Sequence, residues 1–268
     1  MTIINSSYKP KLVKVMDYHR ETHDTFTIKL DWKIDSSPGQ FVFCSLPGIG
    51  EAPISICSYG EKYVELNIRE VGNVTKALSK IKKGSSLLVR GPYGKSYPMD
   101  KFKGHDVIII GGGSGVAPLK ASINYLEKHR SDYGDVFLFF GFRNPDEVLF
   151  VKSMDRWQKK FKLHVSFDKL TKKATYNGKE CFVTQLVDNN IAGAGNKIVF
   201  ICGPPIMIDK TAEILMKKGF STEQIYLSAE RLMYCGIGKC GGCMIHGKYS
   251  CLDGAVFRYD ELKDYRDD

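Results

Sequence analysis

Four of the eight cysteines fall between Glu230 and Asp253, and this grouping most constrains what the chain can fold into. They are Cys235, Cys240, Cys243 and Cys251, in the spacing Cys-x4-Cys-x2-Cys-x7-Cys. Four thiolates can hold a 2Fe-2S cluster, and the first three cysteines have the plant-type cluster spacing. Glycines separate them and suit such a loop, since glycine permits positive φ angles and lets backbone amides point at the sulfurs. The spacing therefore predicts a 2Fe-2S site.

Two other uses of four cysteines stay open, a structural zinc site and a pair of disulfides. Zinc sites of this kind usually carry two Cys-x2-Cys pairs, and this segment has one, Cys240 and Cys243. Disulfides need an oxidising compartment, and the stretch MTIINSSYKPKLVKV has no apolar core long enough for a signal peptide. We therefore expect a cytoplasmic protein with an iron-sulfur cluster first and zinc second.

Composition narrows the class of protein. A chain of 268 residues can hold two domains, and 43% hydrophobic with 26% charged residues is ordinary for a soluble globular protein. No apolar run approaches the roughly 20 residues that cross a bilayer. The net charge of +9 comes from scattered lysines, without a basic block interleaved with aromatics. We expect the chain to bind neither a membrane nor nucleic acid. The charge is expected to serve solvation first and the docking of an acidic protein partner second.

The first hundred residues follow a period of two, as in Phe26, Ile28, Leu30 and Trp32. Six short strands broken by Pro/Gly turns predict a small antiparallel barrel, which leaves no long edge exposed. The expected strands are 12–16, 25–32, 40–45, 54–58, 63–69 and 85–89. One helix is expected over 74–82, with Asn73 as its N-cap and Gly84 just beyond its end.

From Asp106 onward, strands and helices alternate, which predicts a parallel sheet covered on both faces. The expected strands are 107–110, 136–141, 163–167, 197–202 and 224–228. One helix is expected after Pro118, running to about residue 128, and the others run from 147 to 160, 183 to 189 and 205 to 218. The modules are then a barrel over 1–100, an α/β domain over 101–229 and a cluster module with its tail over 230–268. The cluster loop is expected to follow the last strand.

A glycine-rich turn, Gly111 to Pro118, lies between a predicted strand and a predicted helix. Backbone N–H groups and a helix N-terminus at such a place can receive a pyrophosphate, although a plain tight turn stays open. Cys202-Gly203-Pro204-Pro205 ends another strand of the same sheet. Both loops are expected to face one crevice, which favours a bound nucleotide.

The order of these pieces resembles the ferredoxin reductase superfamily over almost the whole chain. In that family a flavin-binding barrel precedes an NAD(P)-binding domain. The resemblance implies flavin contacts at Ala52, Pro53, Ile54, Ser55, Asn67, Ile68, Arg69, Gly72, Val74 and Thr75. It implies nucleotide contacts at Gly111, Gly112, Gly113, Ser114, Gly115, Val116, Pro118, Cys202, Gly203, Pro204 and Met207. Ser55 would hydrogen-bond the flavin ring, and Cys202 would pack near the hydride path.

Ala52 departs from the family, because an arginine is frequent at this position. The phosphate charge would then be met elsewhere, with Arg69 as the candidate, and FAD is expected ahead of FMN. A cluster loop after the nucleotide domain is similar to the electron-transfer subunits of anaerobic sulfite reductase, sulfhydrogenase and dihydroorotate dehydrogenase. The run from Arg90 to Gly94, the ending from Cys251 to Phe257 and the short x7 spacing look most like the sulfite reductase and sulfhydrogenase members.

The resemblance implies a subunit that takes electron pairs from NAD(P)H and passes single electrons through flavin and cluster. The expected recipient is a terminal reductase in a hetero-oligomer with a further iron-sulfur subunit, sirohaem sulfite reductase first, hydrogenase or dihydroorotate dehydrogenase second. NADH is favoured over NADPH because Asp146 and Glu147 follow a strand, although Arg143 and Lys169 could meet a 2'-phosphate. A self-contained small-molecule reductase and a zinc-stabilised binding module stay open as other classes.

Overall fold

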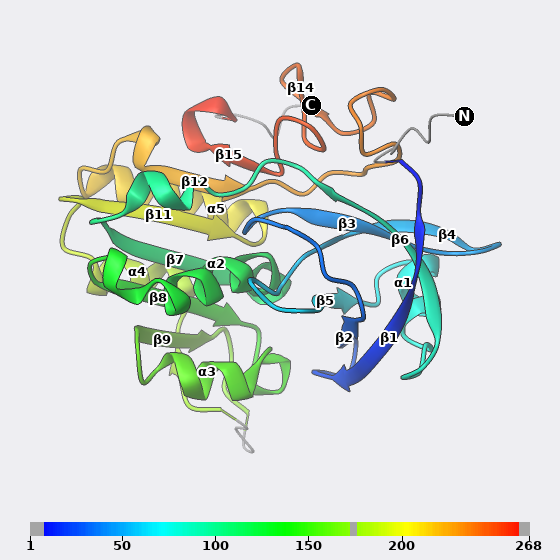
Figure 1. The fold of residues 1–268 in the computed structure, drawn as a ribbon. Helices are drawn as coiled ribbons and strands as arrows, with labels where there is room; N and C mark the ends of the chain where they lie inside the picture. Colours follow the sequence, from blue (N-terminus) through cyan, green and yellow to red (C-terminus); the bar gives the residue numbers. More distant parts are fainter. Residues whose placement is uncertain (1–7, 172–175, 263–268) are drawn as a thin grey trace.

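The computed structural model describes residues 8–171 and 176–262, which form a barrel and a larger sheet flanked by helices (Figure 1). The barrel has six strands in the order β4-β3-β6-β1-β2-β5, each antiparallel to its neighbours. An antiparallel bridge between Ile56 and Leu66 joins the two ends of this sheet. The strands are β1 (Lys11–Arg20), β2 (Thr25–Leu30), β3 (Phe41–Leu46), β4 (Gly50–Ser55), β5 (Val64–Arg69) and β6 (Ser86–Tyr93).

The period of two found in the sequence explains the barrel core. Phe26, Ile28 and Leu30 are fully buried, and they pack with the inward residues of the other strands. Trp32, which the sequence placed on the same strand face, lies beyond the end of β2 and is only partly buried against this core. The predicted antiparallel barrel is therefore confirmed, with one strand shorter than expected.

Two local predictions in the barrel are wrong. The strand predicted over 54–58 is β4, Gly50–Ser55, because the chain pairs with β3 before it turns to bridge Leu66. The helix predicted over 74–82 is α1 (Asn73–Leu78), and its N-cap is Gly72 instead of Asn73. It ends early because the next turns are tighter: the amides of Lys80 and Ile81 donate to the carbonyls of Ala77 and Leu78, three residues back.

The second sheet has seven strands in the order β10-β9-β8-β7-β11-β12-β15. All neighbouring pairs are parallel except β12 with β15, which is antiparallel. Its strands are β7 (Asp106–Gly112), β8 (Val136–Phe142), β9 (Lys162–Phe167), β10 (Lys179–Glu180), β11 (Lys197–Cys202), β12 (Ile225–Ser228) and β15 (Val256–Arg258). Its helices are α2 (Val116–Lys128), α3 (Val151–Trp157), α4 (Val183–Asn190) and α5 (Pro205–Lys217).

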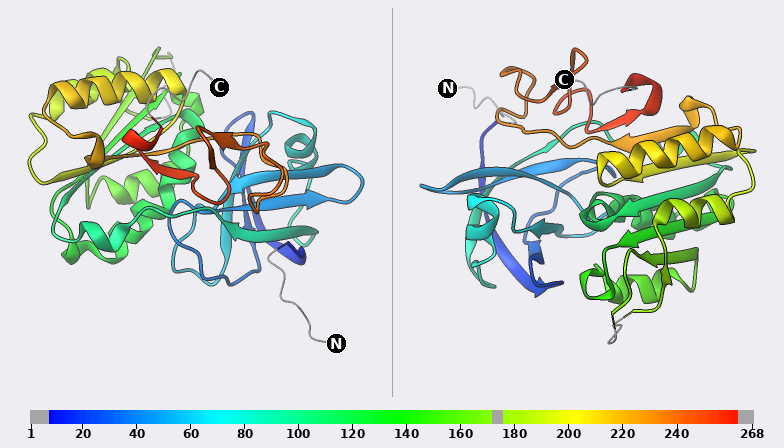
Figure 2. Two further views of the ribbon diagram at one scale, coloured as in Figure 1. Left: turned by 90° about the horizontal axis from the view of Figure 1, so that it is seen from above. Right: turned by 180° about the vertical axis from the view of Figure 1, so that it is seen from behind.

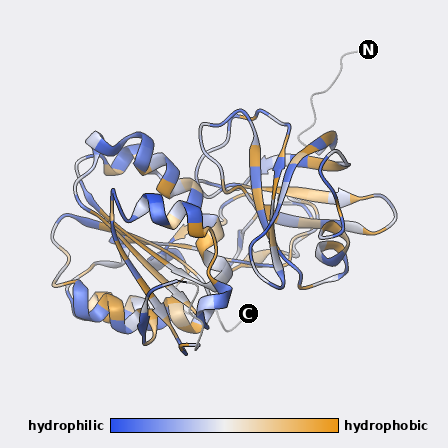
Figure 3. Ribbon diagram, turned by 90° about the horizontal axis from the view of Figure 1, so that it is seen from below, coloured by the Kyte–Doolittle hydropathy of each residue, from blue (hydrophilic) through white to orange (hydrophobic). Residues whose placement is uncertain are grey.

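The helices cover both faces of this sheet, as the alternation of elements predicts. Along β7, Val107 and Ile109 pack with α2 and α3, whereas Ile108 and Ile110 pack with α4 and α5. Hydrophobic residues accordingly run along the strands in Figure 3, while the outward helix faces are hydrophilic. No helix in the described residues is long and apolar enough to span a membrane.

Two predictions for the second sheet are wrong. The helix predicted over 147–160 begins only at Val151, because Phe150 has a left-handed φ of 57° and residues 145–147 form a 3-10 turn. The cluster loop follows β12, the last strand predicted, but it does not hang from the end of the domain, since the chain returns as β15 and pairs with β12. A three-residue strand with a distant partner leaves no periodic signal in a sequence. The limits set for the three modules stay predictions.

The barrel and the sheet meet through a buried ion pair. Lys120 on α2 bonds to Glu65 on β5, and their side chains are only 7% and 8% exposed. Lys120 also lies 4.9 Å from the centre of the Phe150 ring. Nearby, the rings of Tyr59 and Tyr125 pack at 4.8 Å, one from each side of the junction. The junction is thus polar at its centre and aromatic beside it.

We predict that Lys120→Met lowers the thermal unfolding midpoint, because it leaves the Glu65 carboxylate buried without its cation. Removing one partner of a buried pair typically costs about 3–5 kcal/mol. The double variant Glu65→Met/Lys120→Met should recover most of this loss, since no unpaired charge remains. A double variant as unstable as the single one would show that the pair itself stabilises the junction.

Candidate functional site

The glycine turn lies at the carboxyl end of β7, in the middle of the larger sheet. Gly113 to Gly115 form one 3-10 turn, and α2 begins at Val116. Pro118 fits the first helical turn, where a backbone N–H has no partner within the helix. The first N–H groups of a 13-residue helix therefore face the loop, as a pyrophosphate site requires.

The second predicted loop, at the end of β11, touches this turn. A Cβ on Gly115 would lie 2.3 Å from the carbonyl oxygen of Cys202, so only glycine fits there. A Cβ on Gly112 would lie 2.4 Å from the sulfur of Met207. The expectation that both loops face one crevice is confirmed by this contact and by the pocket that they share.

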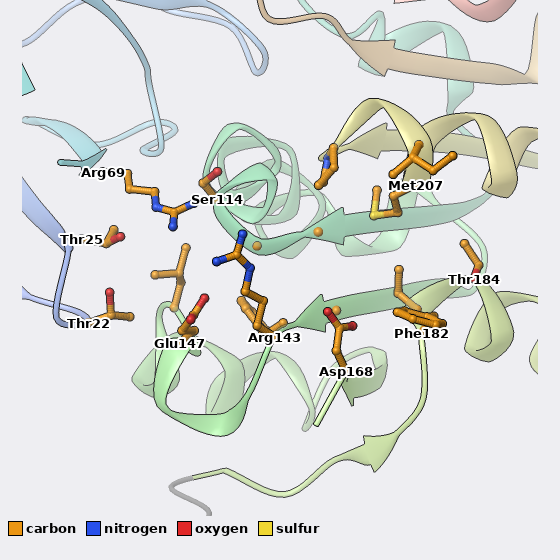
Figure 4. A pocket seen from close by; sticks show the side chains of 18 of the residues that line it. Thr22, Thr25, Arg69, Ser114, Arg143, Glu147, Asp168, Phe182, Thr184 and Met207 are labelled. Carbon is orange, nitrogen blue, oxygen red and sulfur yellow. The ribbon is translucent and has the colours of Figure 1, made fainter. Parts of the chain in front are cut away.

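That pocket has a volume of about 550 Å³ and lies between the barrel and the larger sheet (Figure 4). This is within the range of small-molecule sites, roughly 300–1,000 Å³. Figure 4 shows Arg69, from the barrel, and Arg143, after β8, pointing toward the same space beside Ser114. Asp168, after β9, lies farther along the edge of the sheet.

The barrel wall of the pocket carries a fixed ion pair. The Nε of Arg69 donates to Asp24 at 2.7 Å, and the hydroxyls of Thr22 and Thr25 donate to the same carboxylate at 3.0 and 2.9 Å. Burial acts to raise the pKa of Asp24, but these hydrogen bonds lower it to about 2. Arg69 is thereby held in place, with its charge partly balanced.

The structure brings only some of the predicted contacts to this pocket. From the nucleotide prediction, Gly112, Gly113, Ser114, Pro204 and Met207 line it. The remaining nucleotide positions do not line it, namely Gly111, Gly115, Val116, Pro118, Cys202 and Gly203. From the flavin prediction, Arg69 alone lines it. Of the residues considered for nucleotide choice, Arg143 and Glu147 line it, and Asp146 and Lys169 do not.

The other predicted flavin contacts lie on β4, β5 and α1. Ala52 and Ile54 pack against the barrel core, and the Ile68 side chain is buried in it. Ser55 is partly buried at the end of β4. Asn67 donates to the Thr27 hydroxyl at 2.9 Å. Pro53 also lies on β4, Gly72 is the N-cap of α1, and Val74 and Thr75 lie in the first turn of that helix.

The Thr75 hydroxyl is already used by that turn. It accepts from the N–H groups of Val71 and Gly72, at 3.0 Å each, and donates to the Gly72 carbonyl at 3.1 Å. Cys202 is also enclosed, because its thiol is buried beside Ser228, and burial raises its pKa well above the usual value of a thiol. A neutral thiol at the end of β11 can pack against a ligand but does not act as a base.

Several pocket residues were missed in the sequence. Asp168 had a usable signal, because it directly follows a strand of a parallel sheet, and ligands bind at that edge. Thr22 and Asp24 had none, since they sit in a loop of the barrel that meets the second sheet only in the fold. Phe182 and Lys210, from the segments around α4 and α5, also belong to the lining.

The cysteine loop carries the second site. The amides of Ile237 and Lys239 donate to the Cys235 sulfur, each at 3.4 Å, and the Gly238 amide donates to the Cys251 sulfur at 3.3 Å. Burial acts to raise the pKa of Cys235, but the amide hydrogen bonds lower it to about 6. Gly236 and Gly238 have positive φ, as the predicted loop requires. Amides aimed at sulfur suit thiolates bound to metal.

The four thiols are arranged in two pairs. The Cys235 thiol contacts that of Cys240, and the Cys243 thiol contacts that of Cys251. Within residues 8–171 and 176–262, no three His, Cys, Asp or Glu side chains gather closely enough to hold one metal ion. Four thiols close together in one loop, with backbone amides aimed at their sulfurs, are a donor set that fits an iron-sulfur cluster.

The inner pair of cysteines rests on the barrel. Cys243 and Cys251 are buried against Phe41, Phe43 and Tyr93, which project from β3 and β6. Cys240, in contrast, is exposed to solvent. Figure 2 shows this segment, between β12 and β15, lying over the barrel side of the molecule. The loop thus has one face on the barrel and one face outward.

Comparison with protein families gives two matches. Residues 109–213 match the oxidoreductase NAD-binding domain. Residues 230–263 match the iron-sulfur cluster binding domain of dihydroorotate dehydrogenase B. The two matched segments contain the glycine turn with the Cys202 loop, and the four-cysteine loop, respectively.

Curated relatives align with most of the chain. The gamma subunit of sulfhydrogenase 1 from Pyrococcus furiosus is 36% identical, over 84% of this chain and 80% of that protein. The gamma subunit of sulfhydrogenase 2 from the same organism is 34% identical, over 94% and 90%. A probable dihydroorotate dehydrogenase B (NAD(+)) electron transfer subunit from Methanocaldococcus jannaschii is 30% identical, over 97% and 93%.

A solved structure of an NADH-dependent reduced ferredoxin-NADP oxidoreductase, described for flavin-based electron bifurcation, superimposes with a TM-score of 0.77. It is 24% identical and covers 94% of this chain and 91% of its own, so it supports the fold. The antiparallel barrel followed by a nucleotide-binding sheet is therefore a ferredoxin reductase-like fold, as predicted.

We predict that Gly115→Ala destabilises the protein by about 1–3 kcal/mol, as overpacking usually does. Its backbone angles, φ −64° and ψ −13°, would accept alanine, so the cost comes from the collision with Cys202. Gly193→Ala is the matched control, because its Cβ would lie 3.6 Å from the nearest atom. Thermal unfolding midpoints that are equal for the two variants would contradict the close approach of the loops.

Proposed function

Because the chain belongs to the family of electron-transfer subunits that includes sulfhydrogenase gamma and the dihydroorotate dehydrogenase B subunit, we propose that it carries electrons from NADH to a partner enzyme. Electrons would enter at the pocket, pass through FAD held by the barrel, and leave through a 2Fe-2S cluster in the cysteine loop. The packing of that loop on the barrel carries this proposal, since it holds the cysteines against the module that is proposed to bind the flavin.

In this proposal, binding of the nucleotide needs only backbone hydrogen-bond donors and a pocket of the right shape. The amides at Gly113 and Ser114, with the N-terminus of α2, offer donors and a partial positive charge to a pyrophosphate. Gly112 and Gly115 let the Cys202 and Met207 side of the pocket close against this turn. These contacts bind and orient the dinucleotide, and none of them transfers a proton.

The barrel offers a cation and a hydroxyl to the flavin. A bound flavin accepts an electron pair as hydride and releases electrons one at a time. Arg69, fixed by Asp24, would meet a phosphate that Ala52 cannot, and Ser55 would hydrogen-bond the ring. A pocket of about 550 Å³ that reaches from Arg69 to Met207 has room for the reacting ends of two cofactors. FAD is proposed ahead of FMN.

One cysteine pair would lie where electrons enter the cluster, and the other where electrons leave it. Cys243 and Cys251, buried on the barrel, face the module that is proposed to bind the flavin. Cys235 and Cys240 form the pair nearer solvent, and Cys240 is exposed. A partner that accepts electrons from the outer pair needs no conformational change in the loop. The proposed assembly is therefore a hetero-oligomer with a terminal reductase subunit and a further iron-sulfur subunit.

The terminal partner proposed from the sequence is a sirohaem sulfite reductase. A cytoplasmic hydrogenase is the second candidate. The 36% identity to a sulfhydrogenase gamma subunit supports this second candidate. Purification under anaerobic conditions decides between them, because a sirohaem absorption band or a nickel-iron subunit would accompany the chain. A chain that purifies alone and reduces sulfite steadily with NADH would instead support a self-contained reductase.

We predict that Cys235→Ser abolishes the iron-sulfur EPR signal and electron delivery to the partner, while flavin binding and NADH-ferricyanide activity remain. Ferricyanide can take electrons directly from a flavin, so this activity bypasses the cluster. Cys181→Ser is the matched control, since Cys181 is a partly buried free cysteine outside the loop. Zinc without iron or acid-labile sulfide in the wild-type protein would contradict the proposal.

The choice of nucleotide is proposed to depend on Asp168. Its carboxylate lines the pocket at the end of β9 and would accept hydrogen bonds from the adenosine ribose, as acidic residues do at this edge of such sheets. It would also repel a 2'-phosphate. Arg143, which follows the neighbouring strand β8, is the residue that would favour NADPH. We propose that the carboxylate decides and that NADH is preferred.

We predict that Asp168→Asn raises the ratio of kcat/KM for NADPH over NADH by about tenfold, which corresponds to about 1.4 kcal/mol. The change should come mainly from a weaker discrimination against the 2'-phosphate. Asp188→Asn serves as the control, because Asp188 pairs with Lys218 on the surface, away from the pocket. An unchanged ratio in Asp168→Asn would refute this role for the carboxylate.

A further inference from the structure

Arg90 is a buried cation that does not line the pocket and is not one of the four cysteines of the second site. It lies on β6 in the run Arg90 to Gly94, and its side chain is only 4% exposed. An isolated buried guanidinium is costly, so its partners must repay the loss of water. Those partners come from both the barrel and the cysteine loop.

On the barrel, Arg90 pairs with Glu51 of β4. Its Nε donates to one carboxylate oxygen at 3.0 Å, and its Nη2 donates to the other. The guanidinium also lies 4.0 Å from the centre of the Phe43 ring, and its Nη1 donates to the Tyr93 hydroxyl at 3.1 Å. Glu51 directly precedes the run from Ala52 to Ser55, so this pair joins Arg90 to the strand with the proposed flavin contacts.

On the loop, Arg90 holds the backbone next to the first cluster cysteine. Its Nη2 donates to the Tyr234 carbonyl at 2.9 Å, and its Nη1 donates to the Cys235 carbonyl at 2.7 Å. A guanidinium has five N–H donors. The five hydrogen bonds to Glu51, Tyr93 and the two carbonyls use all of them.

The loop backbone is also sterically fixed at this point. Gly236 has a φ of +75°, and a Cβ there would lie 2.7 Å from Phe43 and 3.2 Å from Nη1 of Arg90. The next amides, of Ile237 and Lys239, are the ones that donate to the Cys235 sulfur. Anchoring the two carbonyls therefore sets the direction of the amides that follow.

We propose that Arg90 is a positioning residue for the cluster, fixing the Cys235 turn on the barrel and raising the reduction potential of the cluster through its charge. The inference rests on the proposed function, because it assumes a cluster at the four cysteines. A reduced cluster carries one more negative charge, so a nearby cation stabilises it, and cluster potentials respond to local charge and to hydrogen bonds at sulfur. Glu51, whose side chain is 32% exposed, offsets part of that effect.

Four variants separate charge from anchoring. Arg90→Met removes both, and Arg90→Lys keeps the charge but loses the planar fork that reaches two carbonyls and a carboxylate at once. Glu51→Gln removes the opposing charge. Arg20→Met is the matched control, because Arg20 also pairs with a barrel carboxylate, Glu70, and lies over an aromatic ring, Phe26.

The first readout is an EPR-monitored redox titration of the cluster in the reconstituted full chain. Arg90→Met should lower the equilibrium constant for reduction of the cluster at least tenfold. For a one-electron couple, tenfold is a shift of about 59 mV to lower potential. Glu51→Gln should shift the potential in the opposite direction. Arg90→Lys should stay within threefold of the wild type, and Arg20→Met should not change it.

The second readout is hydrogen exchange of the amides at residues 237–239, which needs no activity. Exchange there should be at least tenfold faster in Arg90→Met and in Arg90→Lys than in the wild type or Arg20→Met. Unchanged exchange in both Arg90 variants, or a potential in Arg90→Met equal to that of the wild type, would overturn the inference. A wild-type chain that takes up no iron or flavin would instead refute the proposed function, while the exchange comparison still decides the anchoring.

Discussion

The pairing of β15 with β12 is the constraint on which the arrangement of the two sites depends. The chain leaves the larger sheet after Ser228 and returns at Val256, where the two strands are antiparallel neighbours. A hydrogen bond of 2.9 Å from the Ala229 amide to the Ala255 carbonyl closes the intervening loop at its base. With both ends held on the nucleotide sheet, the four cysteines in between lie across the barrel instead of extending into solvent.

This closure makes the loop a bridge between the two modules. Its two ends are held by β12 and β15 of the larger sheet, and strand β7 of the same sheet leads into the glycine turn. Its middle packs on Phe41, Phe43 and Tyr93 of the barrel. The Lys120–Glu65 pair also joins these two modules. A rigid relation between nucleotide pocket, barrel and cysteine loop is what an electron path requires, because transfer between fixed centres needs no reaction step by protein side chains.

The sequence predicted the features that follow from local periodicity and residue type. Alternation in the first hundred residues was enough for the barrel, and the glycine turn between β7 and α2 was enough for the nucleotide crevice. Contacts between distant segments were not predictable in this way. Thr22 and Asp24 reach the pocket from a barrel loop, and Arg90 meets Cys235 across 145 positions of sequence. Such residues are identified only when the fold places them together.

The central claim is that electrons from NADH reach the cysteine loop within this one chain. An anaerobic titration of the purified, reconstituted protein with NADH, followed by optical and EPR spectroscopy, tests it most directly. The account predicts that the flavin bleaches and that a reduced 2Fe-2S signal, with one electron per cluster, grows over the same additions of NADH. Bleaching of the flavin with no cluster signal, while dithionite reduces the same cluster, would contradict it.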